Sequence, residues 1–301
     1  MNTDDSEPAI ADEVDLERVA DTAAHTGEGP LWHADEKRLY WVDIPAGRLY
    51  RYDPSTGRNE TAYETDGTPL GGYTIEADGA LLVFTHGAIE RFVPGADTTE
   101  RVATVDAKTR FNDVIADPEG RVFAGTMPGE TALGDLYRID RDGSAELVMP
   151  SVDIPNGMGF SADESTFYFT ESEARRIDAY DYDRSTGAIS DRRTFVGVPA
   201  DDGVPDGLTV DATGHVWSAR WNGNRVVRYD PAGRPRDAIE LPARKVSSVT
   251  FGGSAYEDLY LTTALTDGDR TTEGTGAGAL FRVPDVGVRG RPEFRSRIAT
   301  E

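Results

Sequence analysis

Short stretches in which apolar or aromatic side chains alternate with polar ones follow one another along most of the chain. One such stretch covers residues 38–43 and the next covers residues 48–52, with turn-forming residues at 45–47 and 53–57. Alternation of this kind, interrupted by Gly, Pro and Asp, is typical of strands joined in hairpins. No long segment repeats its apolar residues with the 3.6-residue period of a helix. The pattern therefore predicts an all-β chain.

One phrase of this pattern recurs at a regular interval. It consists of a small or polar residue, a short apolar run, an Asp/Gly turn and then an alternating aromatic or β-branched stretch. The starting positions divide the chain into six units of about 40 to 50 residues, which is the size of a propeller blade. We therefore expect a six-bladed β-propeller. Three copies align without gaps and begin at Asn112, Asn156 and Asp206, and looser copies begin at Glu28, Gly71 and Ser248.

The remaining segments fit a single propeller domain over residues 1–301. Residues 14–20 precede the first unit and belong to none, so we expect them to supply the outer strand of the last blade and close the ring. Residues 1–13 are expected to form a disordered N-terminal extension. Residues 267–278, rich in Gly, Thr and acidic residues, are expected to form a surface excursion within the sixth unit.

The phase of the repeat predicts where polar side chains meet. The first strand of each blade lies nearest the propeller axis, so the residues that open successive units should approach one central channel. Glu28, Asn112, Asn156 and Asp206 would then form a cage of oxygen atoms. Such donors suit Ca²⁺, Mg²⁺ or Mn²⁺, and Zn²⁺ also accepts carboxylate oxygen. An alternative remains, because Asn-Gly at 156–157 and Asp-Gly at 206–207 are common turn dipeptides.

Composition narrows the class of partner. The chain has 54 Asp and Glu against 31 Lys and Arg, which gives a formal net charge of −23. A surface this acidic repels phosphate backbones and anionic bilayers, so we expect neither nucleic acid nor a membrane as a partner. Lysine is nearly absent, with Lys37, Lys108 and Lys245 as its only positions. This bias suggests adaptation to concentrated salt, and the alternative is an ordinary acidic protein.

Several other chemistries and locations are disfavoured. The chain has no cysteine, which excludes disulfides and thiolate sites. Residues 1–17 are acidic and lack an apolar run, so we expect no signal peptide or membrane span, and a cytoplasmic protein that is a monomer or weak dimer. The motifs of serine hydrolases, zinc proteases, phosphate loops and dinucleotide sites are absent from the sequence.

A set of short motifs, in this order and spacing, resembles the senescence-marker/gluconolactonase family, which includes regucalcin-like lactonases and luciferin-regenerating proteins. The resemblance covers residues 27–290, nearly the whole chain. The motifs that carry it are Gly27-Glu28-Gly29-Pro30, Trp41-Val42-Asp43-Ile44, Arg110-Phe111-Asn112-Asp113, Ala124-Gly125-Thr126-Met127, Pro155-Asn156-Gly157, Pro205-Asp206-Gly207 and Asn222-Gly223-Asn224-Arg225-Val226.

The resemblance implies a six-bladed propeller with one divalent cation in its central channel. It assigns the metal ligands to Glu28, Asn156 and Asp206, and the substrate contacts to Arg110, Asn112 and Glu130. For Arg110, a salt bridge to a neighbouring acidic residue is the alternative role. Four further residues could wall the pocket, although aromatic side chains in propellers more often pack the blades: Trp221, Trp32, Tyr73 and His25.

The implied activity is hydrolysis of a sugar aldonolactone, such as glucono-, xylono- or arabinonolactone, to the aldonic acid. In this hypothesis the cation polarises the lactone carbonyl, and Asp206 is the catalytic base for the attacking water. Metal-bound hydroxide is the rival to Asp206. A non-enzymatic calcium-binding regulatory propeller is the alternative function. The substrate contacts expected at Arg110 and Asn112 favour the enzyme, because a regulator needs only the metal ligands.

Overall fold

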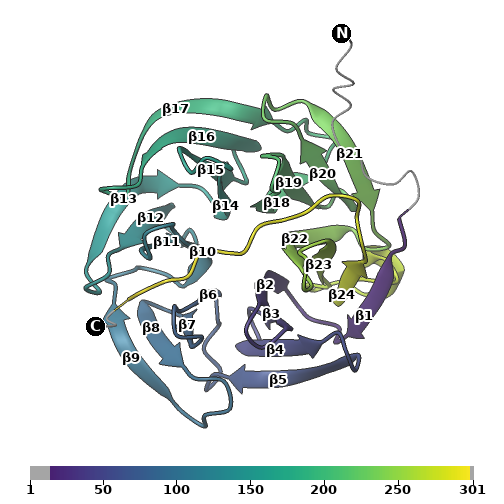
Figure 1. Ribbon diagram of the computed structural model, residues 1–301, viewed down its shortest axis with the longest axis horizontal. Coiled ribbons are helices and arrows are strands. Elements are labelled where there is room, and N and C mark those ends of the chain that lie inside the picture. Colours follow the sequence, from purple (N-terminus) through teal and green to yellow (C-terminus); the bar gives the residue numbers. More distant parts are fainter. Residues whose placement is uncertain (1–13, 299–301) are drawn as a thin grey trace.

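Six four-stranded antiparallel sheets surround a central channel in the computed structural model, which describes residues 14–298 (Figure 1). Each sheet is one blade, and in five of them the four strands follow one another in sequence from the axis outward. The prediction of a six-bladed β-propeller is confirmed. The N-terminal extension predicted over residues 1–13 lies outside the described residues.

The strand bounds follow the repeat closely. The first three blades consist of β2 (Gly27–His33), β3 (Arg38–Asp43), β4 (Arg48–Asp53) and β5 (Arg58–Glu64); β6 (Gly72–Ile75), β7 (Leu81–Phe84), β8 (Ala88–Phe92) and β9 (Thr99–Thr104); and β10 (Phe111–Ala116), β11 (Val122–Thr126), β12 (Gly134–Ile139) and β13 (Ala145–Val152). The fourth and fifth consist of β14 (Pro155–Phe160), β15 (Thr166–Glu171), β16 (Arg176–Asp183) and β17 (Ala188–Gly197); and β18 (Val204–Val210), β19 (Val216–Trp221), β20 (Arg225–Tyr229) and β21 (Pro235–Glu240).

The sixth blade closes the ring with strands from both ends of the chain. It contains β22 (Lys245–Gly252), β23 (Asp258–Ala264) and β24 (Ala279–Val283), and its outer strand is β1 (Glu17–Asp21). Strand β1 pairs antiparallel with β24, as expected from the unassigned segment before the first repeat. The excursion between β23 and β24 carries a one-turn helix, α1 (Arg270–Glu273), which the strand pattern did not predict.

Apolar side chains fill the space between neighbouring blades. Tyr40 and Val42 of β3, for example, pack in one buried cluster with Tyr73 and Val83 of the second blade. A similar cluster joins the fifth and sixth blades around Trp217. Removal of these faces from water is the main force that holds the blades in a ring. It also fixes the inner strands β2, β6, β10, β14, β18 and β22 around the axis (Figure 1).

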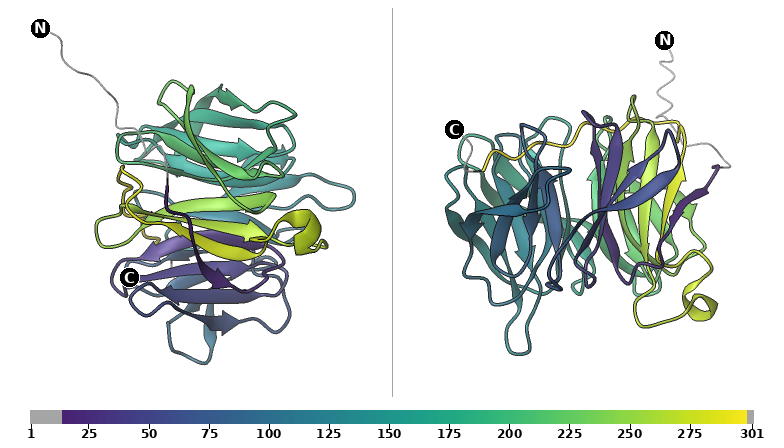
Figure 2. Two further views of the ribbon diagram at one scale, coloured as in Figure 1. Left: turned by 90° about the vertical axis from the view of Figure 1, so that its right-hand side faces the viewer. Right: turned by 90° about the horizontal axis from the view of Figure 1, so that it is seen from below.

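A C-terminal strap, defined here as residues 284–298, crosses one end of the channel (Figures 1 and 2). It contacts residues that follow the inner strands, through hydrogen bonds from Ser296 N to Ile75 O and from Arg297 N to Gly120 O, at 2.9 and 2.8 Å. The strap has partners in all six blades. Besides Ile75 and Gly120, the residues that form hydrogen bonds or ion pairs with the strap include Asp35, Glu164, Ala212, Tyr256 and Glu257.

Helix α1 lies at the opposite end of the ring from the strap (Figure 2). Over residues 14–298, no helix has the length and apolar composition needed to cross a membrane.

Candidate metal centre and active site

A pocket of about 390 Å³ opens at the end of the channel opposite the strap. It collects residues from the starts of the inner strands, and its walls combine carboxylate, amide, guanidinium and apolar groups. The lining residues are Thr26, Glu28, Ile44, Arg110, Asn112, Met127, Ile154, Asn156, Ser172, Glu173, Val204, Asp206, Trp221, Asn222 and Thr266.

Five of the six predicted site residues lie together in this pocket. Glu28 and Asp206 are each 5 % exposed, Asn112 is 6 % exposed and Asn156 is 8 % exposed. Each lies near the start of its inner strand, where the pairing with the next strand shifts register, as between Pro155 and Met158 or between Pro205 and Leu208. An irregularity of this kind re-aims side chains and is common beside active sites.

The glycines after Asn156 and Asp206 have a packing role within strands. A Cβ on Gly157 would lie 2.4 Å from the Leu208 nitrogen and 2.6 Å from the Asp206 oxygen, and one on Gly207 would lie 2.1 Å from Ser248 Oγ. Both dipeptides belong to strands, β14 and β18. The turn interpretation is therefore wrong: these glycines let adjacent inner strands approach closely enough to bring their polar neighbours together.

A chain of hydrogen bonds fixes the two amides. Asn112 Nδ2 donates to Asn156 Oδ1 at 2.5 Å and to Pro155 O at 3.0 Å. Asn156 Nδ2 donates to Ser172 Oγ at 2.8 Å, and this hydroxyl donates to Pro205 O at 2.7 Å. Because an amide oxygen has two lone pairs, Asn156 Oδ1 keeps one for a further partner.

The two carboxylates are buried near a third, Asp113, and of the two only Glu28 is offset by a nearby positive charge, that of Arg110. Burial raises the pKa of Glu28 well above its usual range, and the charges of Asp206 and Asp113 raise it further, while the Gly29 N–H opposes them. Burial and the charge of Asp113 raise the pKa of Asp206 in the same way. Buried carboxylates that repel one another require a positive partner to stay ionised.

This donor set fits a hard divalent cation. Among the described residues, no three Asp, Glu, His or Cys side chains converge as a metal site by themselves. Two carboxylates together with the Asn156 amide oxygen supply an all-oxygen set, which Ca²⁺, Mg²⁺ and Mn²⁺ accept and which Zn²⁺ also tolerates.

Arg110 faces this group without a direct salt bridge. Its side chain is half-buried, and Nη1 donates to Phe111 O at 2.8 Å and to Asn112 Oδ1 at 3.0 Å. Burial lowers the pKa of the guanidinium, and the charges of Asp113 and Glu28 oppose that shift. Within residues 14–298 it has no ion pair shorter than 4 Å, so the salt-bridge alternative fails and its remaining N–H groups are left for a ligand.

Glu130 is the one predicted site residue that the structure does not bring to the pocket. It is exposed in the loop between β11 and β12 and is not among the lining residues. The reason is local, because Gly129 N donates to Ala132 O at 2.8 Å and this tight turn carries Glu130 on the outside of the loop.

Sequence reasoning missed two residues that the structure adds, Asp113 and Ser172, and it named Trp221 only as a possible wall of the pocket. Asp113 is enclosed beside the cage, and burial raises its pKa to about 7 although the charge of Arg110 opposes the shift. Ser172 holds Asn156, as described above. Trp221, at the end of β19, lines the pocket, whereas Trp32 stacks on Tyr260 and is blade packing. Adjacency to Asn112 was a usable signal for Asp113, but nothing in the sequence marked Ser172.

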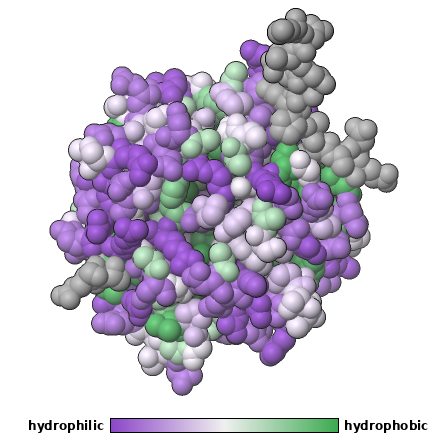
Figure 3. Space-filling model, in the orientation of Figure 1, coloured by the Kyte–Doolittle hydropathy of each residue, from purple (hydrophilic) through white to green (hydrophobic). Residues whose placement is uncertain are grey.

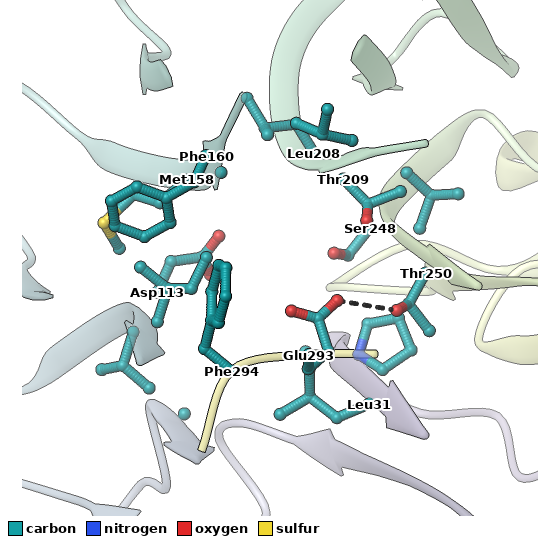
Figure 4. A pocket seen from close by; sticks show the side chains of 18 of the residues that line it. Leu31, Asp113, Met158, Phe160, Leu208, Thr209, Ser248, Thr250, Glu293 and Phe294 are labelled. Atoms are coloured by element: carbon teal, nitrogen blue, oxygen red, sulfur yellow. Dashed lines mark hydrogen bonds between the residues drawn. The ribbon is translucent and has the colours of Figure 1, made fainter. Parts of the chain in front are cut away.

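A second, smaller cavity of about 90 Å³ lies deeper in the channel, toward the strap (Figure 4). Asp113, Ser248, Thr250 and Glu293 point into it, and Thr250 Oγ1 donates to Glu293 Oε1 at 3.4 Å. Strap residues Arg291 and Phe294 also line it. The polar cage of the first-strand residues opens into the outer pocket, whereas the strap crosses the channel on the side of the inner cavity.

The chain is similar to known proteins over most of its length. A family model described as SMP-30/Gluconolactonase/LRE-like region matches residues 26–265. Pentonolactonase XacC of Haloferax volcanii is 54% identical over 288 residues, which are 93% of this chain and 98% of that protein. Regucalcin of Oryctolagus cuniculus is 34% identical over 294 residues, with 93% and 98% covered.

Solved structures share the same architecture. A luciferin-regenerating enzyme superposes with a TM-score of 0.85 at 27% identity, covering 95% of this chain and 100% of that chain. A likeness at this level extends to the whole ring, including the closing blade.

Proposed function

Because this chain belongs to the SMP-30/gluconolactonase/LRE-like family, we propose that it is a metal-dependent lactonase that hydrolyses a five-carbon sugar aldonolactone to the aldonic acid. The family match and the pentonolactonase relative support the class of reaction and a five-carbon substrate. The observation that carries the proposal is the oxygen cage of Glu28, Asn156 and Asp206 with the Arg110 guanidinium beside it, at the base of a pocket.

Glu28, Asn156 and Asp206 would hold the divalent cation, with Ca²⁺, Zn²⁺, Mn²⁺ or Mg²⁺ as candidates. When bound, such an ion supplies Lewis acidity that polarises a carbonyl and stabilises negative charge on its oxygen. The positive charge also offsets the repulsion that raises the pKa values of Glu28 and Asp206. The cage would therefore bind the cation, and the bound cation would keep the carboxylates of the cage ionised.

Arg110 and Asn112 orient the lactone. The guanidinium is planar and carries five N–H donors. Its Nη1 donates to Phe111 O and to Asn112 Oδ1, so the donors on the other two nitrogens are not used by these bonds. Its free N–H groups are suited to ring and hydroxyl oxygens of a sugar. Because Asn112 Nδ2 is committed to Asn156 and Pro155, we assign Asn112 the role of fixing Arg110 and Asn156 as well as contacting substrate.

Asp206 takes the proton from the attacking water. Its carboxylate lies in the pocket, and the Gly207 N–H holds it from the backbone side. After water adds to the carbonyl carbon, the ring C–O bond breaks, and the ring oxygen takes the proton back from Asp206 and leaves as a hydroxyl. The carboxylic acid formed at the same carbon then releases its own proton to water. The product is an open-chain aldonate, whose new carboxylate carries one negative charge.

The test measures acid release from xylono-, arabinono- and gluconolactone in concentrated salt. We expect hydrolysis of the two pentonolactones to stop when a chelator removes the metal and to return when a divalent cation is added. Asp206→Asn and Glu28→Gln should lose at least about a hundredfold in kcat, while the exposed Glu100→Gln keeps the wild-type rate. Full activity after chelation would refute the metal dependence.

A further inference from the structure

One of the three lysines of the chain is enclosed beside the active-site pocket. Lys245 begins β22, and its side chain is 12% exposed. Its Nζ lies 2.6 Å from Glu273 Oε2, and it also lies 5.7 Å from the centre of the Trp221 ring. In a chain where the other basic residues are almost all Arg, a lysine held between a carboxylate and an indole calls for a reason.

The carboxylate partner comes from the excursion between β23 and β24. Glu273 ends α1, its side chain is 10% exposed, and its carbonyl accepts from Arg244 N at 2.8 Å. Asp269 caps the helix through the Thr271 and Thr272 N–H groups. The excursion is thus a short, anchored structure that presents Glu273 to the lysine.

Packing around Glu273 leaves little freedom. A Cβ on Gly268 would lie 2.5 Å from Glu273 Cγ, so glycine at this position lets the loop close over the side chain. Arg270 ties the helix to β1 through Asp21 and donates to Ala277 O at 3.1 Å. Because both ends of the loop are held, the position of Glu273, and with it that of Lys245, is set by the fold.

Trp221 is the point at which this arrangement reaches the substrate site. Trp221 lines the same pocket as Glu28, Arg110 and Asp206. The Lys245 ammonium lies over its ring, 5.7 Å from the ring centre. A cation over an indole is attracted to the ring face, which favours one orientation of the side chain. An oriented indole offers a flat apolar surface beside the oxygen cage.

We propose that Lys245 is a positioning residue that holds Trp221 as a wall of the pocket, against which the C–H face of the lactone ring packs. This rests on the proposed function. The pair with Glu273 keeps the ammonium over the ring, and the loop around α1 transmits its position to the wall. Lys245 therefore acts on substrate binding and on selection between five- and six-carbon lactones, and leaves the chemistry at the cage unchanged.

The first experiment needs no substrate. The near-ultraviolet circular dichroism of Trp221 is defined as the difference between the wild type and Trp221→Phe. We expect Lys245→Met to lose most of this difference signal and Lys245→Arg to keep it, because Arg retains a cation over the ring and a partner for Glu273. Lys37→Met, which removes an exposed lysine, is the matched control and should match the wild type.

The second experiment measures kinetics on xylono- and gluconolactone. We expect Lys245→Met to raise KM for the pentonolactone about tenfold, with kcat within about twofold, and to narrow the preference between the two lactones. Lys245→Arg should restore KM. Glu273→Gln should also raise KM. If far-ultraviolet circular dichroism shows that Lys245→Met is unfolded, Glu273→Gln replaces it as the test variant.

Two results would overturn the proposal: an unchanged Trp221 signal in folded Lys245→Met or Glu273→Gln, or a fall in kcat with KM unchanged. If the wild type hydrolyses no lactone, the proposed function fails, while the Trp221 signal still decides whether Lys245 positions the indole.

Discussion

At the scale of single residues, the site depends on side chains that hold the proposed metal ligands in place. Ser172 follows β15 and joins two inner strands, since its hydroxyl accepts from Asn156 Nδ2 and donates to Pro205 O. Pro205 directly precedes Asp206. One hydroxyl therefore sets the orientation of the Asn156 amide and the position of the strand that carries the Asp206 carboxylate.

Ser172→Ala is expected to weaken divalent-cation binding about tenfold without unfolding the protein. The substitution leaves Asn156 Nδ2 without its acceptor, so the amide can rotate, and loss of such supporting contacts typically costs tenfold or more in metal affinity. Competition between the protein and a chelator for Ca²⁺ and Mn²⁺ measures the effect. The exposed Ser190→Ala on β17 is the control; equal affinity in the two variants would contradict the role of Ser172.

Residue types at the site were predictable only where the repeat fixed their phase. Glu28, Asn112, Asn156 and Asp206 open units of the repeat, so their convergence followed from counting. The structure leaves Glu130 outside the pocket because loop direction depends on one local turn, from Gly129 to Ala132, that no periodicity reports, and its role in substrate binding stays a prediction. Ser172 follows β15 and Trp221 ends β19, and although the repeat marks both strands, only the packed blades show that these two residues reach the pocket.

At the scale of elements, strands were predictable and the strap was not. Apolar and aromatic residues between turn signals mark β3, which is buried along nearly its whole length, and β4, which is buried at three of its six positions. Helix α1 has four residues, too few to show a helical period. The strap lacks any regular structure along most of its length, and its course over the six blades follows from tertiary hydrogen bonds such as that from Ser296 N to Ile75 O.

The strap also places a carboxyl group where water is scarce. Glu293 faces the inner cavity, and burial raises its pKa to about 7, although Thr250 and Arg291 oppose the shift. In the unfolded chain its pKa is about 4.3. Between these values the folded protein holds a proton that the unfolded chain releases, so the contribution of Glu293 to stability is present at low pH and is lost as pH rises toward 7 and above.

Glu293→Gln is expected to remove this dependence. We compare the free energy of unfolding of the variant with that of the wild type at each pH. The difference, variant minus wild type, should be larger at pH 8 than at pH 5 by on the order of 1–3 kcal/mol. Denaturant titrations at the two pH values measure it, with Glu100→Gln as an exposed control on β9. The same pH slope in the variant and the wild type would show that Glu293 titrates normally.

At the scale of the whole molecule, charge dominates the surface. The face in Figure 3 is largely hydrophilic, and the net charge of the chain is −23. Many Arg–carboxylate pairs lie on the outside, such as Arg184 with Glu119 at 2.6 Å, and exposed pairs of this kind contribute little to stability. The acidic excess that remains after this pairing repels itself.

Stability is therefore expected to increase with salt. Raising KCl from about 0.1 M to about 2 M shortens the screening length from about 10 Å to below about 3 Å, which weakens the long-range repulsion more than the short Arg–carboxylate contacts. The thermal unfolding midpoint should rise by several degrees over this range. A parallel series in sucrose separates screening from solute exclusion, and a flat or falling midpoint in KCl would mean that local ion pairs outweigh the net charge.

The position of the strap across the inner end of the channel has a consequence for the kinetics of the reaction. Because the strap crosses the inner end of the channel, we expect the aldonate formed at the cage to leave through the outer pocket, which is also the route by which lactone arrives. Accumulated aldonate and incoming lactone then exclude each other, and turnover slows as the reaction mixture ages even while lactone remains plentiful.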